Sequence, residues 1–229
     1  MTAIAIFVKT PGYSPIKTRL AASIGQDRAE AWHRLAAAAV AELAEQAAIG
    51  PVYFAVAEPE AIGHYLWSGL PNLEQGAGDL GRRLHAIHTQ LVDAHGSALL
   101  LGADTIQWQP TWLRRARDWM QDAPQRWIMG PARDGGFWTF GANFTLPVSS
   151  WTAVPYSRSD TRSRLCEQLG QQGPTGRGDF LPVLTDLDRI EDLPTILDEF
   201  MAYGTASPAV LAAVDCLRAM QSQSSSCRL

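Results

Sequence analysis

Short apolar runs alternate along the chain with longer segments of helical periodicity. The apolar runs predict strands over residues 3–8, 51–57, 98–101, 126–130, 137–141 and 180–184. Helices are predicted over residues 27–48, 80–95, 110–121, 160–169, 190–203 and 208–220. Because strands that alternate with helices form βαβ units, the pattern predicts an α/β protein with a mostly parallel sheet.

The end of the chain has a different pattern from the rest. Residues 221–226 are Ser and Gln without apolar periodicity, and we expect them to be frayed. No internal repeat or linker interrupts the preceding pattern. We therefore expect residues 1–220 to form a single domain and residues 221–229 to form a flexible tail.

The composition of the chain indicates a globular protein and argues against nucleic-acid-binding, membrane and secreted proteins. The 229 residues are 46% hydrophobic and 18% charged, which is typical of a globular protein. The net charge of −4 gives no electrostatic basis for binding nucleic acid. No apolar run is long enough to span a membrane and no signal peptide is readable, so we expect a cytoplasmic protein. Cys166, Cys216 and Cys227 lack paired spacing, which agrees with a reducing compartment.

Tryptophan is concentrated in the middle of the chain. Six of the eight tryptophans are Trp108, Trp112, Trp119, Trp127, Trp138 and Trp151. The cluster indicates either a thick core or an aromatic-lined cleft, and the core is the favoured interpretation.

A basic loop follows the first predicted strand, and it is the first candidate site. The segment 9–20 contains Pro11, Gly12, Lys17, Thr18 and Arg19. A strand that opens into a loop with glycine and lysine before a helix is the usual place for a phosphate site in an α/β sheet. An ordinary solvated basic loop is the alternative.

Carboxylates follow two other strands. Asp104 comes directly after the apolar strand 98–101, where it could hold a divalent ion against a diphosphate. The alternative is that Asp104 caps the turn before the helix at Pro110. Asp186 and Asp188 end the last predicted strand and are possible metal ligands, but we favour Asp188 as the N-cap of the next helix.

Two glycine-containing segments complete the candidates. In the first, Asp134, Gly135 and Gly136 form a strong hairpin signal that would also allow a ligand close to the backbone, and Phe137 and Trp138 could supply an apolar wall.

The second segment runs from Gln75 through Gly78 and Asp79 to Arg82 and Arg83. Its glycines would expose backbone N–H groups to an anion, and Asp79 is also a good N-cap. The scattered histidines, His33, His85 and His88 among them, fit surface or core positions rather than a metal site.

Together these segments resemble the bacterial, glycosyltransferase-labelled branch of the GT-A nucleotide-diphospho-sugar transferase superfamily, which includes the arsenosugar-biosynthesis glycosyltransferase-like proteins. The resemblance rests on Pro11-Gly12 with Lys17-Thr18-Arg19-Leu20, on residues 78–83, on Gly102-Ala103-Asp104 and on residues 130–137. Where the family usually has Gly-Ser-Asp-Cys-Pro, this chain has Gly102-Ala103-Asp104-Thr105-Ile106.

The resemblance implies a three-layer α/β/α sandwich of the GT-A type. It implies catalytic roles for Asp104 and Asp134, with Asp104 holding Mg²⁺ or Mn²⁺. The implied nucleotide-binding residues are Pro11, Gly12, Lys17, Thr18, Arg19, Gln75, Gly78 and Asp79, and the implied substrate-binding residues are Gly135, Gly136, Phe137 and Trp138.

We therefore expect a metal-dependent transferase that uses a nucleotide-activated donor, in the first place a glycosyltransferase acting on a nucleotide-diphospho-sugar. One alternative is a nucleotidyltransferase that releases pyrophosphate from a nucleoside triphosphate. The other is a nucleotide-binding protein without catalytic activity, which the altered neighbours of Asp104 suggest. The donor is the expected partner, and the pattern does not identify an acceptor.

Overall fold

The computed structural model describes residues 1–171 and 176–226, in which seven strands form one sheet. The strands are β1 (Thr2–Val8), β2 (Val52–Val56), β3 (Asn72–Glu74), β4 (Ser97–Gly102), β5 (Arg126–Pro131), β6 (Phe137–Ala142) and β7 (Arg177–Phe180). Their order is β3-β2-β1-β4-β6-β5-β7. Only β6 runs antiparallel to its neighbours, β4 and β5, while the other pairs of neighbours are parallel. The expected mostly parallel α/β sheet is confirmed.

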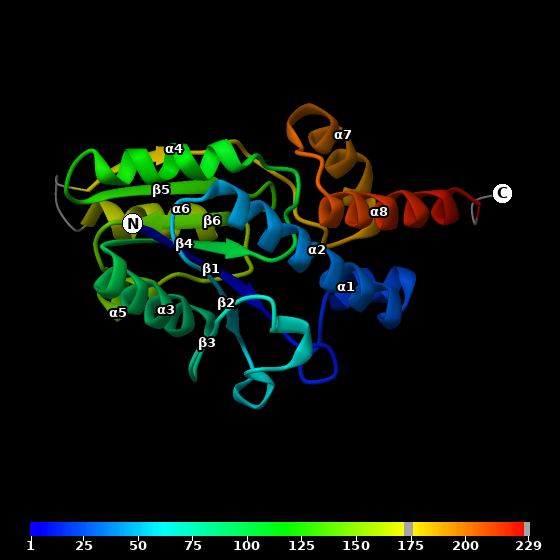
Figure 1. Ribbon diagram of the computed structural model, residues 1–229, viewed down its shortest axis with the longest axis horizontal. Coiled ribbons are helices and arrows are strands. Elements are labelled where there is room, and N and C mark those ends of the chain that lie inside the picture. The colour runs from blue at the N-terminus through cyan, green and yellow to red at the C-terminus, as the bar shows by residue number, and fades with distance from the viewer. Residues whose placement is uncertain (172–175, 227–229) are drawn as a thin grey trace.

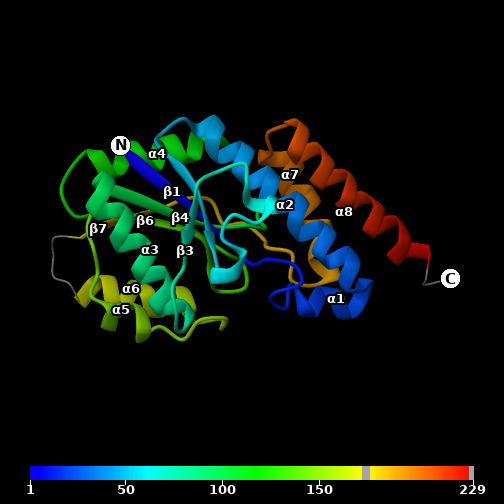
Figure 2. The same ribbon diagram turned by 60° about the horizontal axis from the view of Figure 1, so that its bottom comes forward.

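Helices cover both faces of this sheet (Figures 1 and 2). They are α1 (Thr18–Ile24), α2 (Gln26–Ala47), α3 (Leu80–His95), α4 (Pro110–Gln121), α5 (Val148–Thr152), α6 (Thr161–Gln171), α7 (Leu193–Tyr203) and α8 (Pro208–Ser226). Helices α2, α4, α7 and α8 supply one core, and helices α3, α5 and α6 supply the other. The molecule is therefore the three-layer sandwich that the resemblance implied.

The alternation of side chains along β1 shows how the sequence divides the two cores. Ile4, Ile6 and Val8 face the core that contains α2, and Ala3 and Ala5 face the core that contains α3. Because the side-chain period of a strand is two residues, one apolar strand supplies both layers. Such a strand must be buried on both sides, and these five side chains are at most 1% exposed.

The tryptophan cluster belongs to the core. Trp108 and Trp151 are fully buried, Trp138 is 3% exposed and Trp127 is 8% exposed. The interpretation of the cluster as a thick core is therefore confirmed for these four side chains. Trp151 packs against the rings of His88 and Phe140 in the core that contains α3.

One expectation about the elements is wrong. The last strand is Arg177–Phe180 rather than 180–184, because Pro182 lacks an N–H for the ladder and only Leu184 forms a bridge beyond it. Residues 221–226 belong to helix α8, and the flexibility expected of them stays a prediction. Residues 227–229, with Cys227, lie outside the described residues. The pattern also missed the short elements α1, β3 and α5.

The remaining bounds differ from the expected ones by a few residues at most. The helix of residues 80–95 begins where Asp79 was expected to cap it, and the Asp79 carboxylate accepts a hydrogen bond from Arg82 N at 2.9 Å. Cys166 and Cys216 are free thiols. Within the described residues, none of the helices combines the length and the apolarity that crossing a membrane requires.

Candidate functional site

The candidate residues meet at the carboxyl ends of the parallel strands. The loop after β1 carries Lys17, the loop after β4 carries Asp104, and the loop after β5 carries Asp134. The segment after β7 brings in Asp186 and Asp188 by way of the bridge between Leu184 and Ala132. Ligands of open α/β sheets bind at this edge.

Lys17 lies at the centre of this group because of its backbone. Its φ of 43° and ψ of 47° place it in the left-handed region, at the residue before helix α1. From there Nζ contacts the carboxylate of Asp104 and lies 3.0 Å from Asp188 Oδ1. The guanidinium of Arg19 lies 3.1 Å from Asp188 Oδ2. The basic loop is therefore bound to acidic residues rather than freely solvated.

Opposite charges in this group shift one another's pKa. Burial would lower the pKa of Lys17, but the carboxylates of Asp104 and Asp188 raise it well above its ordinary value. Burial would raise the pKa of Asp104, but the Lys17 ammonium lowers it. Lys17 and Asp104 are therefore both charged in the folded protein at neutral pH.

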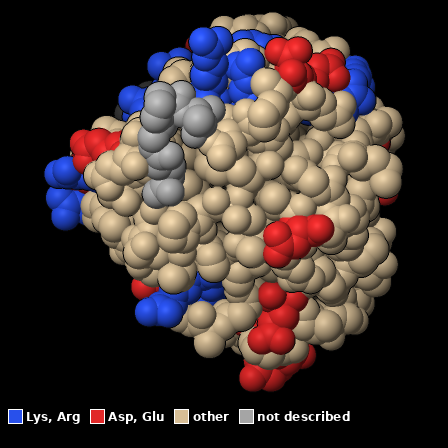
Figure 3. All heavy atoms as spheres, turned by 90° about the vertical axis from the view of Figure 1, so that its left-hand side faces the viewer, with Lys and Arg blue, Asp and Glu red and all other residues tan. Residues whose placement is uncertain are grey.

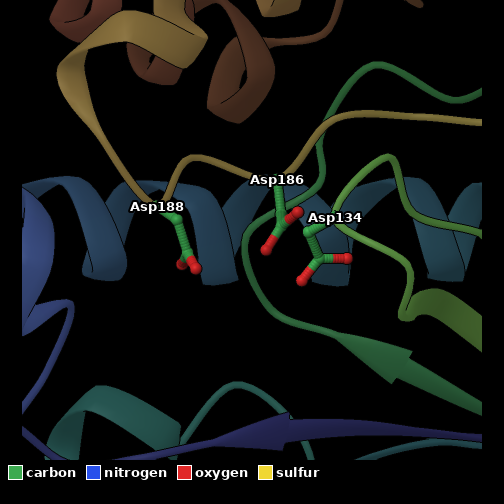
Figure 4. A group of neighbouring side chains, drawn as sticks. All are labelled: Asp134, Asp186 and Asp188. Atoms are coloured by element: carbon green, nitrogen blue, oxygen red, sulfur yellow. The ribbon is translucent and has the colours of Figure 1, made fainter. Parts of the chain in front are cut away.

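Three carboxylates lie close enough to share one cation. Asp134, Asp186 and Asp188 can place one oxygen each within 4.8 Å of one another. Figure 4 shows Asp186 and Asp188 on one loop, with Asp134 reaching the same space from another. Burial, together with the Asp104 carboxylate, raises the pKa of Asp186 to about 7. Asp186, one member of the acidic triplet of Asp134, Asp186 and Asp188, is therefore only partly ionised at neutral pH, and a bound cation would favour its charged form.

Hard divalent cations prefer carboxylate oxygens, so the donor set of the acidic triplet fits Mg²⁺ or Mn²⁺. Asp104 was expected to be the metal ligand, and it lies beside the triplet with its carboxylate on Lys17. Its role at a metal stays a prediction.

A buried glutamate on helix α7 holds the three loops in place. Glu199 is 6% exposed and accepts hydrogen bonds from Thr185 N, Thr185 Oγ1 and Gln107 Nε2, at 2.8, 2.9 and 3.0 Å. Its other contact is with Arg133 Nε at 2.9 Å. Gln107, Arg133 and Thr185 lie in the loops of Asp104, Asp134 and Asp186, so this one carboxylate fixes the spacing of the acidic residues.

The glycine turn that carries Asp134 depends on a close approach. Gly135 has a φ of 94°, and a Cβ there would lie 2.0 Å from Ser159 O. Its carbonyl accepts a hydrogen bond from Arg162 N at 2.9 Å. The turn therefore requires glycine at this position for the start of helix α6 to pack against it.

Two neighbouring cavities open beside the acidic residues. The larger has a volume of about 520 Å³ and is lined by Lys17, His33, Gln75 and Arg83, among others. The smaller has a volume of about 270 Å³. Both are lined by Phe7, Leu80, Gly102, Asp104 and Ser157. The shared wall places Asp104 where one ligand could extend from the larger cavity into the smaller.

The structure brings only some of the expected nucleotide-binding residues to the larger cavity. Lys17 and Gln75 line it, and Gln75 also donates hydrogen bonds to Ala55 O and Val8 O at 2.8 and 3.2 Å. The others lie outside the lining of both cavities, namely Pro11, Gly12, Thr18, Arg19, Gly78 and Asp79.

The expected substrate-binding segment lies at the smaller cavity. Gly136, Phe137 and Trp138 line it together with Asp134, and Gly135 lies behind them against Ser159. Trp151 is fully buried in the core that contains α3 and does not line the cavity.

The favoured interpretation of Asp188 as a helix cap is wrong. The N-cap of the short helix at 190–192 is Arg189, and Asp188 instead contacts Lys17 and Arg19. The histidines hold no metal site among the described residues. His33 bonds to Lys9 O at 2.9 Å, and His88 is fully buried between aromatic rings.

Sequence reasoning missed Glu199, Gln107 and Ser157. A signal for Glu199 is present, because it is an acidic residue on the buried face of helix α7 that also carries Leu193 and Ile196. Ser157 lines both cavities and has a φ of 60°. The sequence contains no pattern that predicts this backbone conformation.

A family model covers the middle of the chain. The family described as an uncharacterized protein conserved in bacteria (DUF2064) matches residues 40–158. No curated protein sequence matches the chain.

Several solved structures are similar to this one. A proposed nucleotide-diphospho-sugar transferase from Desulfovibrio desulfuricans G20 superimposes with a TM-score of 0.77 at 20% identity, over 96% of this chain and 97% of that one. A nucleotidyl transferase from Methanothermobacter thermautotrophicus gives 0.58 at 13% identity, over 88% and 98%. A CMP:2-keto-3-deoxy-manno-octonic acid synthetase complexed with CTP gives 0.50 at 13% identity, over 88% and 97%. These likenesses show that the chain has the fold found in sugar-nucleotide and nucleotidyl transferases.

Proposed function

Because the chain belongs to the DUF2064 family and has the fold found in these transferases, we propose that it is a metal-dependent transferase with a nucleotide-activated donor. The donor that we propose is a nucleotide-diphospho-sugar, and the product is a nucleoside diphosphate. The observation that carries the proposal is the acidic triplet beside Lys17, at the edge of the sheet where such ligands bind.

The charges of the site suit a diphosphate bound through a cation. Asp104 and Asp188 contact Lys17, and Asp188 also contacts Arg19. Asp134 and Asp186 add two more carboxylates beside Asp188. A divalent cation supplies the missing positive charge and, when bound, stabilises the negative charge that develops on a leaving diphosphate. In this proposal Asp134, Asp186 and Asp188 hold the cation.

In this proposal the basic residues of the chain bind the phosphates of the donor. Lys17 and Arg83 line the larger cavity, where they would bind the phosphates and orient the nucleotide. Asp104 and Asp188 hold the Lys17 ammonium in place before a ligand arrives. Such preorganisation lowers the cost of ordering a flexible side chain on binding.

Transfer of a nucleotidyl group is the second candidate. The similarity of the fold to a nucleotidyl transferase and to a CMP-sugar synthetase favours it. Lys17 and Arg83 would then bind a nucleoside triphosphate, and its nucleotidyl group would pass to an oxygen of the acceptor as the bond to pyrophosphate breaks.

The leaving group distinguishes the two candidates. We expect the protein, incubated with Mn²⁺ and a panel of sugar nucleotides, to release a nucleoside diphosphate, which chromatography identifies. Pyrophosphate released from a nucleoside triphosphate would favour the second candidate instead. Binding without release of either product would favour the non-catalytic alternative.

Phosphate recognition by the basic loop has its own test. Replacing Lys17 with Ala should weaken binding of a nucleoside diphosphate by roughly 1.5–3 kcal/mol and leave binding of the nucleoside nearly unchanged. Calorimetry of both ligands measures the difference. Equal losses for the two ligands would show that Lys17 does not bind phosphate.

A further inference from the structure

The smaller cavity differs in chemistry from the larger one. Its walls include the apolar side chains of Phe7, Leu84, Leu100 and Phe137, whereas the ring of Trp138 lies in the other core, against Trp108 and Trp112. The ionisable side chains among its lining residues are the carboxylates of Asp104, Asp134 and Asp186 and the phenol of Tyr156. A ligand that fits this cavity therefore combines an apolar body with a polar group beside the carboxylates.

Two of the hydroxyl groups in the lining already have protein partners. Tyr156 Oη donates to Trp151 O at 3.1 Å, and Thr161 Oγ1 donates to Pro155 O at 2.8 Å. A sugar ring carries hydroxyls all around its edge. The carboxylates of Asp104, Asp134 and Asp186 could accept hydrogen bonds from some of them, but the hydroxyls that face the apolar wall of Leu84, Leu100 and Phe137 would have no partner. Each buried hydroxyl without a hydrogen bond costs about 1–3 kcal/mol. The cavity is therefore poorly suited to a sugar and better suited to an apolar group.

One hydroxyl in the lining is unused. Thr105 is 1% exposed and lines the smaller cavity, and its Oγ1 has no hydrogen-bond partner among the described residues. Because this oxygen is itself buried, a ligand in the cavity would not contact it in this conformation, so Thr105 adds no polar group to the cavity wall.

From these observations we infer that the smaller cavity binds the acceptor, and that the acceptor is an alcohol with an aromatic or aliphatic body. This inference rests on the proposed transferase function. The apolar body lies against Leu84 and Phe137, and the hydroxyl group lies at the carboxylates of Asp134 and Asp186. The donor then occupies the larger cavity, and the two substrates meet beside Asp104, which lines both cavities.

Matched variants of Leu84 test the inference. Leu84→Phe fills the cavity, and Leu84→Met keeps its volume approximately and serves as the control. The probes are 4-methylbenzyl alcohol and glucose, detected by saturation-transfer NMR in the presence of Mn²⁺ and a nucleoside diphosphate. We expect the aromatic alcohol to bind to the wild type and to the Met variant, and to bind about tenfold more weakly, or not at all, to the Phe variant.

A second variant keeps the test decisive if Leu84→Phe does not fold. Phe137→Ala removes a partly exposed wall of the same cavity and should weaken binding of the aromatic alcohol while the affinity for the nucleoside diphosphate stays the same. Preference for glucose over the aromatic alcohol would overturn the inference, and so would equal binding to all variants.

The proposed function fails separately from this inference. Binding of the nucleoside diphosphate without the aromatic alcohol overturns the acceptor assignment and leaves the proposed function intact. Binding of the aromatic alcohol without any nucleotide overturns the proposed function, and with it the description of the alcohol as an acceptor.

Discussion

The two ends of the central sheet differ in the charge of the side chains that meet there. At the amino end, Thr2 Oγ1 and Ser97 Oγ form a buried hydrogen bond of 2.8 Å, and the backbone of Gly50 packs against Thr2. The face of the molecule at that end is largely uncharged in its centre, with charged side chains around it (Figure 3). At the carboxyl end, the loops bring Lys17 and the acidic triplet together beside two cavities.

This difference indicates that the residues at the amino end contribute mainly to stability, and that those at the carboxyl end contribute mainly to ligand binding. At the amino end, the buried hydroxyls of Thr2 and Ser97 pair with each other, and a neutral pair costs less desolvation than a pair of charges. The carboxyl end gathers four carboxylates around two cations, and like charges at close range oppose folding. Glu199 keeps those loops in place from behind. We therefore expect changes at the amino end to affect stability alone, and changes at the carboxyl end to affect ligand binding.

The largest effect is expected when the support of the carboxyl end is removed. Glu199→Ala leaves Arg133, Gln107 and the backbone N–H of Thr185 without their buried partner. Because Arg133 is largely exposed, the cost comes mainly from the buried donors of Gln107 and Thr185, and the free energy of unfolding should fall by about 2–4 kcal/mol, as measured by urea denaturation.

Glu199→Gln is the matched control, because the amide keeps one acceptor oxygen. It should cost less stability than Glu199→Ala and still weaken cation binding. A loss below 1 kcal/mol for Glu199→Ala would show that the three loops do not depend on this carboxylate.

At the amino end, Gly50→Ala should destabilise the protein without touching the site. A Cβ at Gly50 would lie 2.4 Å from Thr2 O, and a backbone atom inside a sheet cannot move aside easily. The expected loss is about 1–3 kcal/mol in urea denaturation. The affinity for a nucleoside diphosphate should stay the same once the protein is folded. A weaker affinity in the folded variant would show that a change at the amino end also affects ligand binding at the carboxyl end.

His88 contrasts with the charged residues at the carboxyl end, because it is a titratable group in the core without a partner of opposite charge. It is fully buried beside Phe140 and Trp151, and burial lowers its pKa from 6.5 to about 3. The unfolded chain takes up a proton below pH 6.5 and the folded protein does not. Stability is therefore lost as the pH falls from 6.5 towards 3.

The loss attributable to His88 should reach about 2 kcal/mol between pH 7 and pH 5. His88→Leu should remove this part of the pH dependence, as measured by urea denaturation at both pH values. The same slope in the wild type and in the variant would show that His88 becomes protonated in the folded protein.

A smaller effect, of opposite sign, is expected within the acidic triplet. Asp186→Asn removes one of the crowded carboxylates and should stabilise the metal-free protein by about 1 kcal/mol at pH 8. The same change should weaken Mn²⁺ binding. Thermal denaturation with a chelator measures the first effect, and calorimetry measures the second. If the variant were less stable in chelator, the carboxylates would not be repelling one another in the folded protein.

Much of the fold could be predicted from the sequence because its elements are long and strongly patterned. The helix of residues 80–95 has a cap at Asp79, amphipathic spacing and a terminal glycine at 96, and its bounds agree with the structure. The short strand β3 is partly exposed, and its three residues carry no pattern of their own. The segment 180–184 is apolar enough for a strand, but Pro182 prevents a continuous ladder.

The site was less accessible to sequence reasoning. Each candidate carboxylate follows a strand, so the meeting of Asp104, Asp134 and Asp186 at one edge was predictable from a parallel sheet. The pairing of Asp188 with Lys17 was not, because it depends on the left-handed backbone of Lys17 and on a contact across most of the chain. A local sequence pattern does not predict contacts between residues so far apart in the chain.

Calorimetric titration with a panel of nucleoside diphosphates, with Mn²⁺ and again with a chelator, tests the central claim most directly. The wild type should bind at least one of them with Mn²⁺ and lose most of that affinity in chelator. Asp134→Asn should abolish the dependence on Mn²⁺, and the control Asp118→Asn, an exposed carboxylate on helix α4, should not change it. Equal affinity with Mn²⁺ and with chelator, or an equal effect of both variants, would contradict a cation-dependent nucleotide site at the carboxyl end of the sheet.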